Sequence, residues 1–340
     1  MSYRFISILK NLSSITTGSG IQTRSATYMP RPVTVIHGVL TNAVEEVMDA
    51  MHVPVYLETY NIKGKNMNHF PREVVDSIRK NKVCLNGRVN NSLCGGSRKE
   101  LDLFASLVNC FNLNGQPSRY KNVDIVVVIE NTKGEYAGRE HEVVPGVIQS
   151  FQVTMTKFWS DRIAKYAFEY ARLSNRKKVT AVHSKGKDEK LADAFFLESC
   201  QEVAKMYPSI TYNEIGINNC CLQLVEKPEQ FDVIVTSNLY GNIIANIAVG
   251  IAGAGNNGEI MPGGSFGSEY AIFEQVGPVE NHKNPVALLF SSVMMLRHLL
   301  LPLFADRLET AMKRAVSEGK CGNSNTTTQE VVEAVIANMD

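Results

Sequence analysis

The chain has 340 residues, enough for about two domains of ordinary size. Hydrophobic residues make up 44% of it and the net charge is +1, so the composition supports a buried core and gives no sign of a nucleic-acid or membrane-surface partner. The seven cysteines form no C-x-x-C pair, which favours reduced thiols in the core over a disulfide framework or a zinc site.

The first 25 residues have the composition of a targeting sequence. No Asp or Glu precedes Glu45, whereas Arg4, Lys10 and Arg24 are basic and serines are frequent. A basic, serine-rich, acid-free start is typical of a mitochondrial or plastid transit peptide. The sequence therefore predicts a transit peptide in residues 1–25, with a disordered tail as the alternative.

Short β-branched runs alternate with helical patterns along the rest of the chain. Buried strands are predicted at 33–36, 124–128, 178–182 and 231–235. This alternation predicts an α/β architecture with helices on both faces of a sheet.

Three helices are predicted between these strands. The first begins near Asn42, with Glu45 completing a capping box, and the second begins at Pro71. The third carries an apolar face from Ile163 to Ala171. Nothing in the chain is apolar for long enough to span a bilayer; the best candidate, 286–304, contains polar and charged residues and predicts a buried helix.

A glycine cluster at 253–258 satisfies the G-x-G-x-x-G pattern, with Glu274 about 20 residues further on. The pattern needs a strand before it and a helix after it. Residues 239–251 instead read as a helix, and Met261-Pro262-Gly263-Gly264 cannot open one. We therefore interpret the cluster as a flexible connection and the fold as non-Rossmann.

Three long motifs in the middle of the chain carry a specific resemblance. Residues 98–105 read RKELDLFA, residues 130–138 read ENTKGEYAG, and residues 238–242 read NLYGN. In sequence, order and spacing they resemble the isocitrate/isopropylmalate dehydrogenase family from about residue 33 onwards. The pattern is most similar to the non-catalytic, regulatory subunits of plant mitochondrial NAD-dependent isocitrate dehydrogenase.

The resemblance implies a fold of two α/β domains with a clasp arm. A large domain would combine 32–103 with 253–340, and a small domain would span 104–252 and carry the dimer clasp after Tyr136. The core of the large domain would include apolar residues of its C-terminal helices, namely Val286, Leu289, Val293, Leu308, Val332 and Ile336.

The metal site of the family is altered in this chain. Aspartates hold Mg²⁺ or Mn²⁺ in the family, and the corresponding positions here are Asn218, Asn242 and Asn246. Neutral amides bind a divalent ion far less strongly than carboxylates do. We expect no metal site, and the alternative reading of the asparagines is that they are ordinary solvent-facing residues.

The residues for substrate binding and proton transfer are also reduced. Of three substrate arginines in the family only Arg98 remains, and Val108 and Ile129 stand at the other two positions. Arg98 would be a remnant of a substrate or effector site, and the alternative is a structural ion-pair partner. Tyr136 retains the family's tyrosine. Lys185 is the nearest candidate for its lysine but is shifted in register, so a solvated loop lysine is the alternative.

The resemblance implies no catalytic residue in use and no cofactor of the chain's own. The strand 33–36 runs into His37-Gly38-Val39-Leu40-Thr41 without the glycines and acid of the family's nucleotide turn, so cofactor-binding residues stay unassigned. NAD and Mg²⁺ or Mn²⁺ would be bound by a catalytic partner subunit.

We therefore expect a regulatory or scaffolding subunit in the mitochondrial matrix, assembled with a catalytic NAD-isocitrate dehydrogenase subunit and open to a small tricarboxylate effector. The alternatives are an active NAD- and Mg²⁺-dependent decarboxylating dehydrogenase and a degenerate paralogue without function. Asparagine at the metal positions argues against the active enzyme.

Overall fold

The computed structural model describes residues 30–62, 69–87, 95–113, 120–132, 140–150, 156–184, 191–252, 261–276, 284–321 and 326–339. The chain forms two compact units. Unit 1 comprises Met1–Leu103, Asn112–Arg119 and Gly253–Asp340, and unit 2 comprises Phe104–Phe111 and Tyr120–Ala252. Both ends of the chain therefore contribute to unit 1, while unit 2 comes from the middle.

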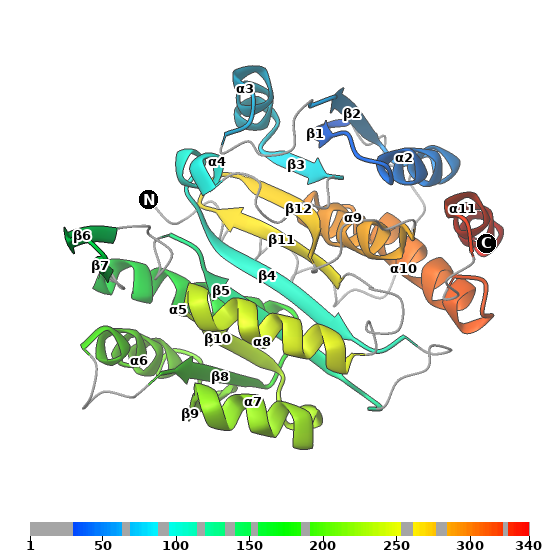
Figure 1. Ribbon diagram of the computed structural model, residues 1–340. Helices are drawn as coiled ribbons and strands as arrows, with labels where there is room; N and C mark the ends of the chain where they lie inside the picture. The colour runs from blue at the N-terminus through cyan, green and yellow to red at the C-terminus, as the bar shows by residue number, and fades with distance from the viewer. Residues whose placement is uncertain are drawn as a thin grey trace. The chain divides into compact units, whose positions relative to one another are not determined.

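Unit 1 contains a mostly parallel sheet in the order β2-β1-β3-β12-β11, in which only β11 runs antiparallel to its neighbour (Figure 1). Its strands are β1 (Arg31–Ile36), β2 (Val55–Tyr60), β3 (Val83–Asn86), β11 (Met261–Gly267) and β12 (Ala271–Val276). Its helices are α2 (Thr41–Ala50), α3 (Arg72–Asn81), α4 (Gly95–Glu100), α9 (Val286–His298), α10 (Pro302–Ser317) and α11 (Thr328–Ala337).

The two faces of this sheet are covered by different helices because side chains alternate along each strand. Ile36, Cys84 and Ile272 pack with the buried face of α3, whereas Phe273 points the other way and meets His298 of α9. Five of the six predicted core residues of the C-terminal helices are buried, and Ile336 is half-buried.

Unit 2 contains a sheet in the order β4-β5-β10-β8-β9, in which β4 alone is antiparallel. Its strands are β4 (Leu103–Phe111), β5 (Asp124–Glu130), β8 (Lys178–His183), β9 (Thr211–Gly216) and β10 (Val233–Thr236), with a separate hairpin of β6 (Glu140–Val144) and β7 (Val147–Ser150). Its helices are α5 (Lys157–Leu173), α6 (Leu191–Ala204), α7 (Ile217–Glu226), the 3₁₀ turn η1 (Pro228–Gln230) and α8 (Asn238–Ile251).

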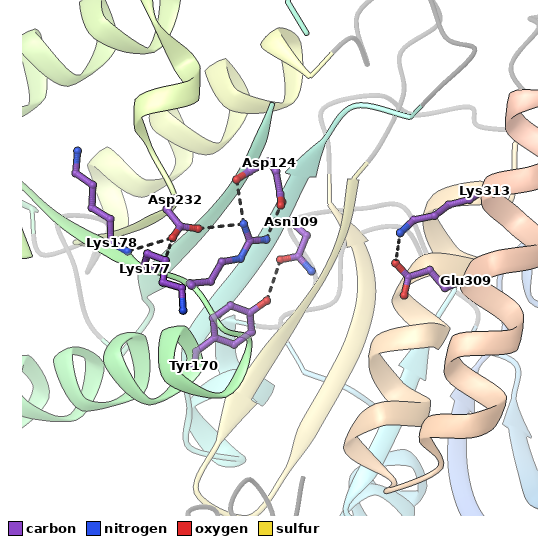
Figure 2. A network of polar contacts seen from close by, with 9 residues as sticks. Asn109, Asp124, Tyr170, Lys177, Lys178, Asp232, Glu309 and Lys313 are labelled. Atoms are coloured by element: carbon purple, nitrogen blue, oxygen red, sulfur yellow. Dashed lines mark hydrogen bonds and ion pairs between the residues drawn. The ribbon is translucent and has the colours of Figure 1, made fainter. Parts of the chain in front are cut away.

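A polar network fixes the amino ends of the parallel strands in unit 2. The Arg176 guanidinium donates to Asp232 at 3.0 Å and to Asp124 at 2.7 Å, and Asp232 also accepts the backbone N–H of Lys177 at 2.6 Å. Figure 2 shows Asp124, Asp232 and Lys177 converging there, with the Tyr170 hydroxyl donating to Asn109 beside them. The network ties the start of β8 to the starts of β5 and β10, and so holds their register.

The predicted α/β architecture is confirmed, with several local corrections. The capping box at Asn42 is wrong: α2 begins at Thr41, its N-cap is Leu40, and the Glu45 carboxylate accepts from Thr59 instead. The RKELDLFA motif at 98–105 spans two elements, because α4 ends at Glu100 and β4 begins at Leu103. Pro71 is the N-cap of α3 rather than its first residue.

Candidate functional site

The three asparagines that the resemblance places at the family's metal positions lie on two neighbouring helices of unit 2. Asn218 is in the first turn of α7, and Asn242 and Asn246 are one turn apart on α8, which packs against α7. All three side chains are exposed. The Asn242 amide donates to the side-chain and backbone oxygens of Asn238 at 3.2 and 3.3 Å.

This arrangement does not fit a divalent cation. Mg²⁺ and Mn²⁺ need charged carboxylate oxygens, and three neutral amides supply none. Nowhere in the described residues do three or more His, Cys, Asp or Glu side chains come together as a metal site would require.

The two residues that the resemblance places at the family's other arginine positions lie in the core of unit 2. Val108 on β4 and Ile129 on β5 are 1% and 3% exposed. Ile129 lies directly under Gly241 of α8: a Cβ added at Gly241 would come within 2.4 Å of the Ile129 Cγ2. The glycine of the NLYGN motif therefore allows α8 to approach β5 closely, and an apolar side chain fills the space beneath it.

Arg98, which the resemblance places at the family's first arginine position, belongs to α4 of unit 1. Its Nη2 donates to Glu274 Oε1 of β12 at 3.2 Å. The same carboxylate accepts from Asn86 of β3 at 3.0 Å and from Ser265 of β11 at 3.1 Å. Arg98 thus has a carboxylate partner within its own unit, which the sequence could not show because the two residues are 176 positions apart.

The first residues of the ENTKGEY motif, at the end of β5 in unit 2, make several polar contacts. Glu130 is 3% exposed, burial raises the pKa of its carboxyl group, and its Oε1 accepts the N–H of Thr132 at 2.7 Å. Arg162 of α5 donates to Thr132 at 3.2 Å and lies over the Phe104 ring at 4.0 Å. The sequence did not identify Arg162 as a candidate site residue, because an arginine in an amphipathic helix such as α5 is common and belongs to no motif.

Neither of the two proton-transfer candidates lies in the described part of the chain, since Tyr136 and Lys185 both fall outside it. The described residue nearest to Lys185 is Ser184, whose N–H and hydroxyl both donate to Asp193 at 3.0 and 2.9 Å. His183 is the last residue of β8.

The turn after β1 is closed by the chain itself. The buried Thr41 hydroxyl donates to the Gly38 carbonyl at 2.8 Å and forms a 2.9 Å hydrogen bond with His37 Nδ1. Gly87 lies against the Thr41 methyl, where an added Cβ would come within 2.1 Å. A nucleotide turn needs free backbone N–H groups and room for a phosphate, so these residues do not fit a dinucleotide.

The glycine-rich pattern at 253–258 lies outside the described residues. Its surroundings agree with the interpretation that it is not a dinucleotide loop, because α8 precedes it and a strand, β11, follows it. Glu274 binds Arg98 instead of a ribose. None of the helices that the structure describes combines the length and hydropathy of a bilayer span.

Comparison with known proteins extends the resemblance to almost the whole chain. An Arabidopsis thaliana protein named NAD isocitrate dehydrogenase subunit-like 4 is 75% identical, over 92% of this chain and 100% of its own length. The mitochondrial regulatory subunit 1 of NAD isocitrate dehydrogenase from the same plant is 60% identical over the full length of both chains.

Among solved structures, isocitrate dehydrogenase from Methylococcus capsulatus superposes with a TM-score of 0.80 at 31% identity, covering 91% of this chain and 99% of that one. The sequence model for isocitrate/isopropylmalate dehydrogenases matches residues 32–335. The chain therefore belongs to the isocitrate/isopropylmalate dehydrogenase family.

Proposed function

We propose that this chain is a non-catalytic regulatory or scaffolding subunit of the mitochondrial NAD-dependent isocitrate dehydrogenase complex. Its similarity to plant proteins named as regulatory subunits supports the assignment to that complex. The observation that carries the non-catalytic part is the chemistry of the site: exposed amides stand at three metal positions and buried aliphatic side chains at two substrate-arginine positions.

The loss of charge should abolish turnover by this chain alone. Removing one preorganised electrostatic group commonly lowers a rate by about 10²- to 10³-fold, and several are replaced here at once. The purified chain should show no isocitrate-dependent NAD reduction in the presence of Mg²⁺. Robust turnover by a contaminant-free sample would establish the active-dehydrogenase alternative.

The surfaces suited to assembly are retained. The β6–β7 hairpin, our proposed dimer clasp, exposes Val143, Val144 and Val147, each by slightly more than half. On α7 and α8 the exposed apolar residues include Leu222 and Ile243, which are 56% and 45% exposed. Exposed apolar side chains on neighbouring elements are typical of an association surface. We propose a catalytic isocitrate dehydrogenase subunit as the partner.

The experiment is co-expression with that catalytic subunit, followed by size-exclusion chromatography with light scattering. We expect one heteromeric peak, with at least about 2,000 Å² buried in total, as in obligate complexes. Leu222→Asp combined with Ile243→Asp should split the peak. Leu303→Asp is the matched control, because Leu303 on α10 of unit 1 is 71% exposed and belongs to neither proposed surface.

Separate elution of the unmodified chain at micromolar concentration would contradict the proposal, provided that the catalytic chain still pairs with an intact regulatory subunit. The degenerate-paralogue alternative would then take its place.

A further inference from the structure

Strand β2 has a strand partner on one side only. Among the strands that the structure describes, β1 alone pairs with it, and β2 stands at the end of the sheet order. The carbonyls of Pro54 and Tyr60 face β1, because they accept N–H groups from its first residue and from the residue after its end, at 3.0 and 2.9 Å. Successive strand residues direct their backbone groups alternately to the two sides. The backbone groups of Leu57 and Thr59 therefore point away from β1.

This outer edge lacks the features that usually prevent an edge strand from pairing. Proteins protect exposed edges with lysines, prolines or β-bulges. The β2 sequence, VYLETY, contains neither lysine nor proline, and all six of its residues pair with β1 without a shift in register. Such an edge is suited to accept a further strand.

The only charged side chain of β2 is held by α3 of the same unit. The Glu58 carboxylate accepts from Asn81 at 2.9 Å and from Ser77 at 3.0 Å. It also pairs with Lys80 at 3.2 Å, and the Glu58 side chain is 19% exposed. Two copies of this edge can therefore approach each other without bringing uncompensated like charges together.

We propose that β2 pairs with β2 of a second copy of this chain in an antiparallel arrangement, so that two unit 1 sheets join edge to edge. The register follows from the outward backbone groups. Leu57 of each copy exchanges backbone hydrogen bonds with Leu57 of the other, and Thr59 donates to the Val55 carbonyl of the other copy. The N–H of Val55 is not needed, and it is already bonded to the Val53 carbonyl at 2.8 Å.

The side chains favour a second copy as the occupant of this edge. In this register Tyr56 of each copy lies opposite Glu58 of the other, on the same face of the joined sheet. Tyr56 is 61% exposed in the single chain, and its hydroxyl can donate to the carboxylate of Glu58. A two-fold axis at Leu57 makes the two halves of the contact identical, as in most homodimers.

The proposed pairing uses none of the residues that we assign to binding the catalytic subunit. It goes beyond the proposed function, and the two proposals are tested by different variants.

The test is the molar mass of the full 340-residue chain, measured by size-exclusion chromatography with light scattering. A concentration of about 100 μM suffices to form a complex with a micromolar Kd. Leu57→Pro removes the outward N–H, and proline is tolerated at such positions of an edge strand. Leu57→Ala is the matched control, because it shortens the same side chain and keeps the N–H. We expect the proline variant to lose about half of the mass of the unmodified chain and the alanine variant to keep it.

Tyr56→Glu decides the question if Leu57→Pro does not fold, as judged by circular dichroism. It changes an exposed side chain and places a carboxylate opposite Glu58 of the other copy, at both ends of the contact. We expect the Kd of the pair to rise at least about tenfold, and less in Tyr56→Gln, which adds no charge. A monomeric unmodified chain, equal masses for the proline and alanine variants, or unchanged association of folded Tyr56→Glu overturns the proposal.

Discussion

At the scale of single residues, the resemblance implies that this chain carries neutral residues at positions where the family carries charged ones, and these residues lie in two different environments. The asparagines that the resemblance places at the metal positions are exposed, and an asparagine has the shape of an aspartate without its charge. Val108 and Ile129 are buried, so they have joined the packing of unit 2. The family resemblance identified the candidate positions, but their burial and pairing depend on residues far away in the chain, as the Arg98–Glu274 pair shows.

Restoring the arginine at Ile129 should therefore destabilise the chain without restoring catalysis. Ile129→Arg would bury a guanidinium beneath Gly241 with no room and no counter-charge, which should lower the free energy of unfolding by about 3 kcal/mol or more. Ile129→Val, which only removes a methylene, should cost roughly 0.5–1.5 kcal/mol. Urea unfolding of both variants measures the difference, and near-equal losses would show that the space under α8 is not closely packed.

His298 on α9 should make the stability depend on pH. Burial lowers the pKa of its imidazole from 6.5 to about 4. Between these values the unfolded chain holds a proton that the folded chain does not, so the free energy of unfolding falls as the pH drops below 6.5 and is unaffected by this group above it. The loss should reach about 2 kcal/mol at pH 5.

The check is the urea midpoint at pH 7 and pH 5 for the unmodified chain and for His298→Phe, which keeps a ring against Phe273. The variant should lose less stability between the two pH values. Parallel losses in both proteins would assign the pH dependence to other groups.

At the scale of elements, hydrophobic periodicity predicted several strands and helices. It missed a strand whose residues are unfavourable for strands. The runs at 124–128 and 178–182 fall inside β5 and β8, and the apolar face from Ile163 to Ala171 is buried in α5. Strand β11 was not predicted, because Pro262, Gly263 and Gly264 all disfavour a strand, yet every residue of it is buried and it pairs with β12 in an antiparallel hairpin. The single helix predicted at 286–304 is divided, since α9 ends at His298, Leu300 has a φ of 59° and α10 begins at Pro302.

The start of α5 allows a test of capping in isolation. The Thr156 hydroxyl accepts the N–H of Trp159 at 3.3 Å, and the Thr156 side chain is exposed, so its replacement disturbs little else. Thr156→Ala should lower the free energy of unfolding by about 1 kcal/mol, whereas Thr156→Ser, which retains a capping hydroxyl, should be nearly neutral. Denaturant unfolding distinguishes them, and equal stability of the alanine and serine variants would show that the cap contributes nothing.

At the scale of the whole molecule, each unit draws its stability from contacts between distant parts of the sequence. In unit 1, β12 pairs with β3 across nearly 190 positions, as the Asn86–Glu274 separation of 188 shows. In unit 2, Arg176 joins Asp124 and Asp232. No local pattern encodes such pairings, which is why periodicity predicted an α/β architecture, whereas the two-domain family fold was predicted only from the family resemblance.

The proposed mitochondrial targeting of the chain depends on its first 25 residues. Residues 1–25 remain a proposed transit peptide, since they fall outside the described residues. Fused to a fluorescent reporter, they should direct it to mitochondria and be cleaved, because basic, acid-free presequences are recognised by import machinery. Changing Arg4, Lys10 and Arg24 together to Glu should leave the reporter in the cytosol. A cytosolic signal from the unmodified fusion would remove the targeting proposal.

The way in which unit 1 is shared between the two ends of the chain has a consequence for biosynthesis. Strands β1, β2 and β3 emerge early from the ribosome, but β12, which pairs with the free edge of β3, is made 188 residues later. Until then β3 presents unpaired backbone and apolar surface to its surroundings, a state prone to aggregation. Nascent or imported chains should therefore depend on chaperones for as long as the C-terminal segment is missing, and a chain that stops after Ala252 should be degraded rather than accumulate.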